Sequence, residues 1–147
     1  MQHLMRLTLS ICLPRDSVSI PVSRHIVRDT LERIGVTEEC LADIAVAQSE
    51  ACTNVVEHSG PGDEYEISVE IIDDYCVITV ADSGHGFDSN RPPEAVVLGE
   101  GGRGIDLMKA LVDNVHFVTQ PGSGTSVYLK KALRFRDDSV VRRFADG

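Results

Sequence analysis

The sequence predicts an α+β fold, a two-layer sandwich in which helices pack on one face of a mixed, mostly antiparallel sheet. Three observations support this prediction. The N-terminal part contains two runs with helical spacing of apolar residues, the later part contains runs with strand composition, and two of those runs are separated only by Asp73-Asp74. With 147 residues, the chain is long enough for one domain with its own core.

The N-terminal part is predicted to form a strand followed by two helices. Residues 4–13 are rich in Leu, Ile and Thr and partly alternate, so they predict a strand that Pro14 ends. Residues 18–34 carry apolar side chains near helical spacing, and Gly35 suits the end of that helix. A second helix is predicted over residues 39–57, after which a Gly-Pro-Gly sequence ends it.

The rest of the chain is predicted to contain four strands, a glycine-rich loop and one short helix. In chain order these are the strands 65–72 and 75–81, the loop 82–104, the helix 105–112, and the strands 115–119 and 126–133. The charges alternate beyond this last strand. We therefore expect a single domain over residues 1–133 and a flexible tail over residues 134–147.

The composition excludes some classes of function. The formal net charge of -9 argues against a nucleic-acid surface, because such surfaces need clustered Lys and Arg. An acidic protein can still bind a nucleotide when backbone amides and a metal ion neutralise the phosphates. The N-terminal apolar run is broken and too short for a bilayer, and the cysteines are scattered. We therefore expect a cytoplasmic protein with reduced thiols that contacts neither nucleic acid nor membrane.

The predicted second helix carries the most informative pair of side chains. Its apolar residues share one face, which we assign to the core, whereas Glu50 and Asn54 lie on the other face, one turn apart. An Asn side-chain oxygen is a hard ligand that suits Mg²⁺, and a Glu carboxylate can accept a proton from an attacking hydroxyl. The same pair is also compatible with an ordinary solvated helix face.

A second candidate follows a predicted strand, in the sequence Asp82-Ser-Gly84-His-Gly86. Alternating glycines allow a ligand to approach the backbone closely. An Asp at the end of a strand could accept a hydrogen bond from an adenine amino group, which would select adenine over guanine. An ordinary turn has the same composition.

A third candidate is the run that opens the predicted short helix, Gly101-Gly102-Arg103-Gly104. Free N–H groups at the start of a helix bind phosphate, and Arg103 could add a charge-assisted hydrogen bond. The run matches neither the P-loop pattern nor the Rossmann pattern. A hinge loop would have a similar composition.

A fourth candidate precedes the last predicted strand, in the sequence Gly122-Ser-Gly124-Thr125. The Thr125 hydroxyl could support the adenine contact directly or through a water molecule. A plain hairpin turn is the alternative interpretation of this sequence.

Four segments in this order resemble the N, G1, G2 and G3 boxes of the GHKL ATPases, which have a Bergerat-type fold. They are SEACTNVVEH, DSGHGF, GGRGIDLM and GTSVYLKK, and the resemblance extends from about Leu41 to Lys131. It implies that Glu50 is the general base, that Asn54 is the Mg²⁺ ligand, and that Asp82 binds the adenine amino group. The other positions that it assigns to the nucleotide are Gly84, Gly86, Gly101, Gly102, Arg103, Gly104 and Thr125. The loop 88–100 would be the ATP lid.

Within that superfamily the chain is most similar to the anti-sigma serine/threonine protein kinases, because of its length, the SEA-x-TN form of its N box and its GTSVYLKK ending. This similarity implies ATP and Mg²⁺ as cofactors and transfer of phosphate to a serine of an anti-anti-sigma (STAS-domain) protein. It also implies sequestration of a sigma factor and a homodimer.

Two other functions are compatible with an ATP-binding fold. A regulatory module could use ATP only to set its shape for partner binding, without phosphoryl transfer. A catalytic fragment of a sensor histidine kinase would need a phospho-accepting His on a dimerisation helix. His25 lacks the acidic neighbour and the downstream Pro of such a motif, so the sequence disfavours this function.

Overall fold

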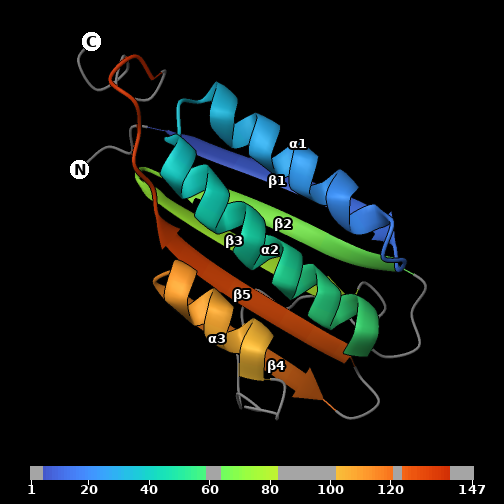
Figure 1. Ribbon diagram of the computed structural model, residues 1–147. Coiled ribbons are helices and arrows are strands. Elements are labelled where there is room, and N and C mark those ends of the chain that lie inside the picture. The colour runs from blue at the N-terminus through green and yellow to red at the C-terminus, as the bar shows by residue number, and fades with distance from the viewer. Residues whose placement is uncertain (1–4, 59–63, 83–101, 121–123, 140–147) are drawn as a thin grey trace.

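The computed structural model describes residues 5–58, 64–82, 102–120 and 124–139 (Figure 1). The predicted two-layer α+β fold is confirmed, and each predicted helix and strand lies within a few residues of its expected bounds. The elements are β1 (Arg6–Pro14), α1 (Ser19–Arg33), α2 (Glu38–His58), β2 (Glu64–Ile72), β3 (Tyr75–Asp82), α3 (Gly102–Leu111), β4 (Asn114–Gln120) and β5 (Gly124–Ala132).

The strands form one sheet in the order β1-β2-β3-β5-β4. We expected a mixed, mostly antiparallel sheet, and all the described pairs are antiparallel. The β2–β3 hairpin turns through Asp73 and Asp74, and Asp73 adopts a positive φ of 56°. Asp tolerates this left-handed conformation better than most residues, which suits it to a tight hairpin.

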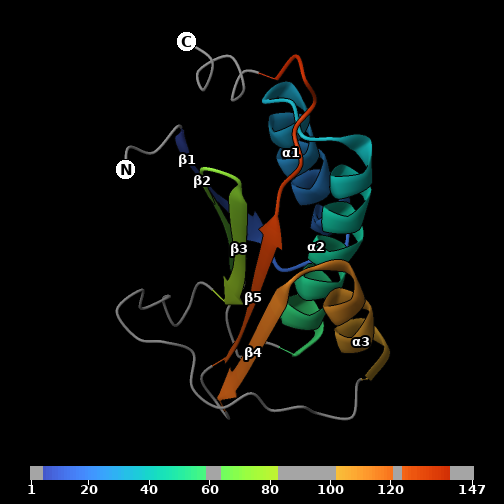
Figure 2. The same cartoon turned by 90° about the vertical axis from the view of Figure 1, so that its left-hand side faces the viewer.

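The helices all lie on one side of the sheet, as the view in Figure 2 shows. The helix α2 contacts β3 and β5, α1 contacts β1 and α2, and α3 contacts α2 and β4. Alternate strand residues point into this layer and are buried; they include Tyr65, Ile67, Val69, Ile71, Ile78, Val80, Val127 and Leu129. The core therefore lies between one face of the sheet and the three described helices.

The buried stripe of α1 includes only some of the apolar residues that predicted the helix, together with two serines. Val22 and Ile26 are exposed, whereas Ser19 and Ser23 are buried. Burial of these hydroxyls is possible because each has a hydrogen-bond partner: Ser19 Oγ lies 2.8 Å from Tyr65 Oη, and Ser23 Oγ donates to a backbone carbonyl. The helical period was correct, but the side that faces the core was not readable from hydropathy alone.

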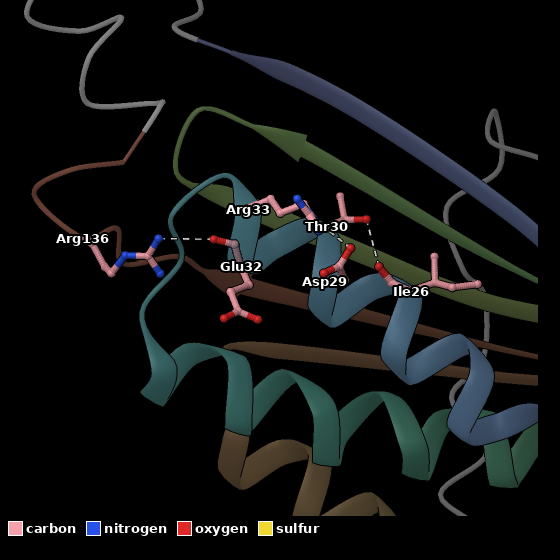
Figure 3. A network of polar contacts seen from close by, with 6 residues as sticks. All are labelled: Ile26, Asp29, Thr30, Glu32, Arg33 and Arg136. Carbon is pink, nitrogen blue, oxygen red and sulfur yellow. Dashed lines mark hydrogen bonds and ion pairs between the residues drawn. The ribbon is translucent and has the colours of Figure 1, made fainter.

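Residues 134–139, which we expected to begin a flexible tail, lie against the turn between α1 and α2. Arg136 N donates to the Gly35 carbonyl at 2.7 Å, and Thr37 N donates to the Arg134 carbonyl at 2.9 Å. Figure 3 shows the Arg136 side chain directed at the backbone of α1, where its guanidinium donates to the Glu32 carbonyl at 3.4 Å. Residues 140–147 lie outside the described part of the chain.

We expect Gly35→Ala to destabilise the protein, because two features of this position require glycine. Gly35 has a φ of 102°, and a Cβ there would collide with the side chain of the buried Ser139. Both effects act on the folded state, so the free energy of unfolding should fall by roughly 1–3 kcal/mol or more. Urea denaturation measures this change. Glu32→Ala, at an exposed position nearby, is the matched control, and equal midpoints for the two variants would contradict the expectation.

Candidate nucleotide site

Two candidate side chains lie on α2, where the core fixes their direction. Ala51, Cys52 and Val55 are fully buried, and they hold one face of the helix against the sheet. Glu50 and Asn54 project from the adjoining part of the helix and are half-buried, one turn apart. A well-packed helix is a rigid support, so this pair has a fixed position relative to the sheet.

The beginning of α3 lies directly against this pair. A Cβ atom built on Gly104 would stand 2.8 Å from Glu50 Oε2 and 3.9 Å from Asn54 Nδ2. Only a residue without a side chain allows the α3 backbone to come so close to the Glu50 carboxylate. Since the first N–H groups of a helix have no partner within the helix, a helix end with free N–H donors lies beside a carboxylate and an amide.

The Asn54 side chain retains unused hydrogen-bonding capacity. Its Nδ2 atom is buried and has no hydrogen-bond partner among the residues that the structure describes. A buried polar group in this condition costs about 1–3 kcal/mol, which a ligand or an ordered water could recover. An unsatisfied amide beside a carboxylate and a helix N-terminus is a feature of a site that accepts a polar ligand.

These residues suit Mg²⁺ better than a metal that needs a full set of protein ligands. The described part of the chain contains no group of three or more His, Cys, Asp or Glu residues that could hold a metal ion. Mg²⁺ usually takes one or two protein oxygens and completes its shell with water and phosphate oxygens. The Asn54 side-chain oxygen is a ligand of this kind, so the residues present fit Mg²⁺ carried by a nucleotide.

Two further candidates, Asp82 and Thr125, lie on neighbouring central strands. The β3–β5 register pairs Ala81 with Ser126, so the next position in the ladder brings Asp82 opposite Thr125. Both residues are on the helix side of the sheet, and both are buried, with 3% and 1% of their surface exposed. A buried acceptor and a buried hydroxyl are therefore neighbours where the two strands meet.

All these residues belong to one end of the domain. Figures 1 and 2 show that α2 and β3 end there, whereas α3 and β5 begin there. The arrangement brings together a helix pair, a helix N-terminus and the ends of two central strands. The sequence predicted each of these helices and strands separately. The topology of the fold brings α2, α3, β3 and β5 together at this end.

Several predicted positions cannot be placed. Gly84, Gly86, Gly101 and the lid residues 88–100 lie outside the described residues. Gly102 and Arg103 open α3, but the structure describes nothing of the Arg103 side chain.

The thiol nearest in sequence to the α2 pair is not a competing nucleophile. Cys52 is fully buried, and this burial raises the pKa of its thiol to about 12. A thiolate is the reactive form of cysteine, so Cys52 stays protonated and inert near neutral pH.

One charged residue, at the opposite end of α2 and α3 from this site, was not among the predicted site residues. Lys131 directs its Nζ atom into the helix layer, where it contacts both α2 and α3. The alternation of side chains along β5 could have identified Lys131 as a residue that faces the helices. Lys131 lies on the same side of the strand as Val127 and Leu129, whereas Lys130 lies on the other side.

Comparison with known proteins identifies the family. Residues 13–131 match the family described as the histidine kinase-like ATPase domain. The chain belongs to the histidine kinase-like ATPases. It is 36% identical over 140 residues to the serine-protein kinase RsbW of Bacillus licheniformis, with 81% of this chain and 86% of that protein covered. It is 30% identical over 148 residues to the serine-protein kinase RsbW of Bacillus subtilis, with 90% and 91% covered. These relatives confirm the predicted serine-protein kinase activity.

A solved structure supports the fold of this histidine kinase-like ATPase. It contains the RsbU and RsbW domains of a Mycobacterium tuberculosis protein, and it superposes with a TM-score of 0.67 at 24% sequence identity. The match covers 88% of this chain but only 34% of the other, so the chain spans about a third of that protein. Among the helices that the structure describes, none has the length and apolar character needed to cross a membrane.

Proposed function

We propose that this serine-protein kinase binds Mg·ATP at the end of the domain where α2, α3, β3 and β5 meet. The phosphates would lie at the α3 N-terminus, and Asn54 would be the protein ligand of Mg²⁺. Asp82 would accept a hydrogen bond from the adenine amino group, with Thr125 beside it. The observation that supports this proposal most strongly is the close approach of Gly104 to Glu50 and Asn54, which brings a helix N-terminus suited to phosphate beside an acid–amide pair.

Glu50 would act as the general base. A partner serine hydroxyl gives its proton to the Glu50 carboxylate while its oxygen forms a bond to the γ-phosphorus and the bond to the β–γ bridging oxygen breaks. When bound, Mg²⁺ neutralises charge on the phosphate oxygens. The remaining catalytic contribution is positioning, because phosphoryl transfer needs the attacking and leaving oxygens roughly in line.

The protein substrate that we propose is an anti-anti-sigma (STAS-domain) protein, phosphorylated on a serine. In a second state, the same kinase would bind a sigma factor and sequester it. We further propose that the kinase works as a homodimer. These partners are implied by the resemblance to anti-sigma kinases, and the acidic net charge of -9 agrees with protein rather than nucleic-acid partners.

The experiment that tests this function is incubation of the full chain with γ-labelled ATP, Mg²⁺ and a candidate anti-anti-sigma protein. We expect label on a serine of the partner and none without Mg²⁺. Partner binding that depends on ATP but leaves the partner unlabelled would instead support a regulatory module without transfer. A partner variant with that serine replaced by alanine is the control.

A further inference from the structure

Lys131 occupies a junction of three elements. It lies on β5, its side chain is 17% exposed, and its Nζ atom donates to the Leu111 carbonyl at 2.7 Å. The same atom lies 3.2 Å from Asp43 Oδ2 on α2. Leu111 is the last residue of α3, so a cation from the sheet satisfies a carbonyl at the negative end of that helix and also joins it to α2.

The turn after α3 is attached to the same strand by two hydrogen bonds, one from the backbone and one to the side chain of Asp113. Asp113 N donates to the Lys130 carbonyl at 2.9 Å, and the Asp113 carboxylate accepts from Ala132 N at 2.6 Å. These bonds and the Lys131 contacts fix the C-terminal end of α3 to β5. Lys131 alone among these residues extends the attachment to α2.

The two helices have matching spacings between their contacts. Glu50 lies seven positions after Asp43 on α2, and Leu111 lies seven positions after Gly104 on α3. Each interval is about two turns, or roughly 10.5 Å. Since Glu50 meets Gly104 at one end and Asp43 is linked to Leu111 at the other, the helices run antiparallel and in register. A shift at the Lys131 end therefore moves the N-terminus of α3 relative to Glu50.

We infer that Lys131 is a positioning residue for phosphoryl transfer. It does not touch the reacting atoms; it acts through α3, whose N-terminal backbone it holds against Glu50 and Asn54. The buried residues Ile105 and Met108 attach α3 to the core, and the directed hydrogen bond from Lys131 Nζ fixes the C-terminal end of the helix. The inference rests on the proposed function for its catalytic part only.

The test compares Lys131→Met with Lys130→Met in the full chain. Lys130 is the adjacent residue on the opposite face of β5, where its Nζ atom lies 4.6 Å from the centre of the Tyr75 ring. Both variants lose one positive charge and keep a long side chain. They therefore differ only in whether the altered side chain lies on the helix side of β5 or on its other side. Lys131→Arg, which keeps the charge and the hydrogen-bond donors, is the conservative variant.

Two readouts are needed. The first is amide hydrogen exchange of α3 without nucleotide, which we expect to be about tenfold faster in Lys131→Met and unchanged in Lys130→Met. The second is the kcat for transfer of labelled phosphate, which we expect to fall by about tenfold or more in Lys131→Met, with a smaller rise in the KM for ATP. Lys131→Arg should recover most of the kcat. If Lys131→Met does not fold, Asp43→Asn replaces it in the test. We expect Asp43→Asn to increase the amide exchange of α3 by less than Lys131→Met would.

The outcomes separate this inference from the proposed function. Unchanged α3 exchange in Lys131→Met, or equal loss of kcat in the Lys130 and Lys131 variants, overturns the positioning role. The proposed function would be rejected if the wild type transferred no phosphate. If α3 exchange were still faster only in the Lys131 variant, Lys131 would remain the residue that holds α3 in place.

Discussion

Glu50→Gln is expected to lower the rate of phosphoryl transfer by about 10²- to 10⁴-fold while ATP affinity changes little. Gln has the same shape and length as Glu but cannot accept the serine proton at neutral pH. The close approach of this position to Gly104 remains possible, because no non-hydrogen atom is added. Single-turnover transfer of labelled phosphate measures the chemical step, and calorimetry measures the affinity for ATP.

A matched control for this variant lies on the same helix. Glu57 is exposed and near the end of α2, so Glu57→Gln removes an equal charge about two turns beyond Glu50. We expect that variant to transfer phosphate at close to the wild-type rate. Full transfer activity in Glu50→Gln would exclude Glu50 as the base.

Gly104→Ala is expected to separate activity from stability. The new Cβ would stand 2.8 Å from Glu50 Oε2, which lies at the end of a flexible side chain, so the carboxylate would move rather than the backbone. Within a helix, alanine is about 1 kcal/mol more favourable than glycine. We therefore expect a kcat roughly 10²-fold lower, since a small misplacement of a catalytic group has effects of this size, and an equal or higher free energy of unfolding.

Transfer kinetics and urea denaturation of the same preparation test this pair of effects. Lys109→Ala, at an exposed position of α3, is the control, and we expect it to keep the wild-type rate. A Gly104→Ala variant that transfers phosphate at the wild-type rate would show that the position of the Glu50 carboxylate in this structure is not the one used in catalysis.

Most of the fold was predictable because the elements of the core have regular patterns. On α2, the residues Leu41, Ile44 and Val55 recur at helical spacing, and all are buried as expected. The hairpin at Asp73-Asp74 followed from turn composition. The core side of α1 was not predictable, because Ser19 and Ser23 are buried through hydrogen bonds that only the folded structure provides.

The candidate site was predictable in its parts but not in its contacts. The spacing of Glu50 and Asn54 gave their common face, and the strand pattern gave the place of Asp82 at the end of β3. The approach of Gly104 to Glu50 and the junction at Lys131 depend on how α3 packs on α2, and no local pattern encodes a contact between segments so far apart in sequence.

The C-terminal segment shows a similar limit of local patterns. The alternating charges after residue 133 predicted a tail from composition alone. Residues 134–136 are held to the α1–α2 turn by backbone hydrogen bonds, and Ser139 is buried. Because neither interaction depends on apolar side chains, a hydropathy pattern does not predict that this segment is ordered.

We propose that Glu50, Asn54, Asp82 and the α3 N-terminus surround a single Mg·ATP. Calorimetric titration with ATP, with and without Mg²⁺, tests this arrangement most directly when the wild type is compared with Asn54→Ala. We expect one ATP per chain in the wild type, bound more tightly with Mg²⁺, and an Asn54→Ala variant whose ATP affinity no longer responds to Mg²⁺. Absence of ATP binding by the wild type, or an unchanged Mg²⁺ response in Asn54→Ala, would contradict the proposed site.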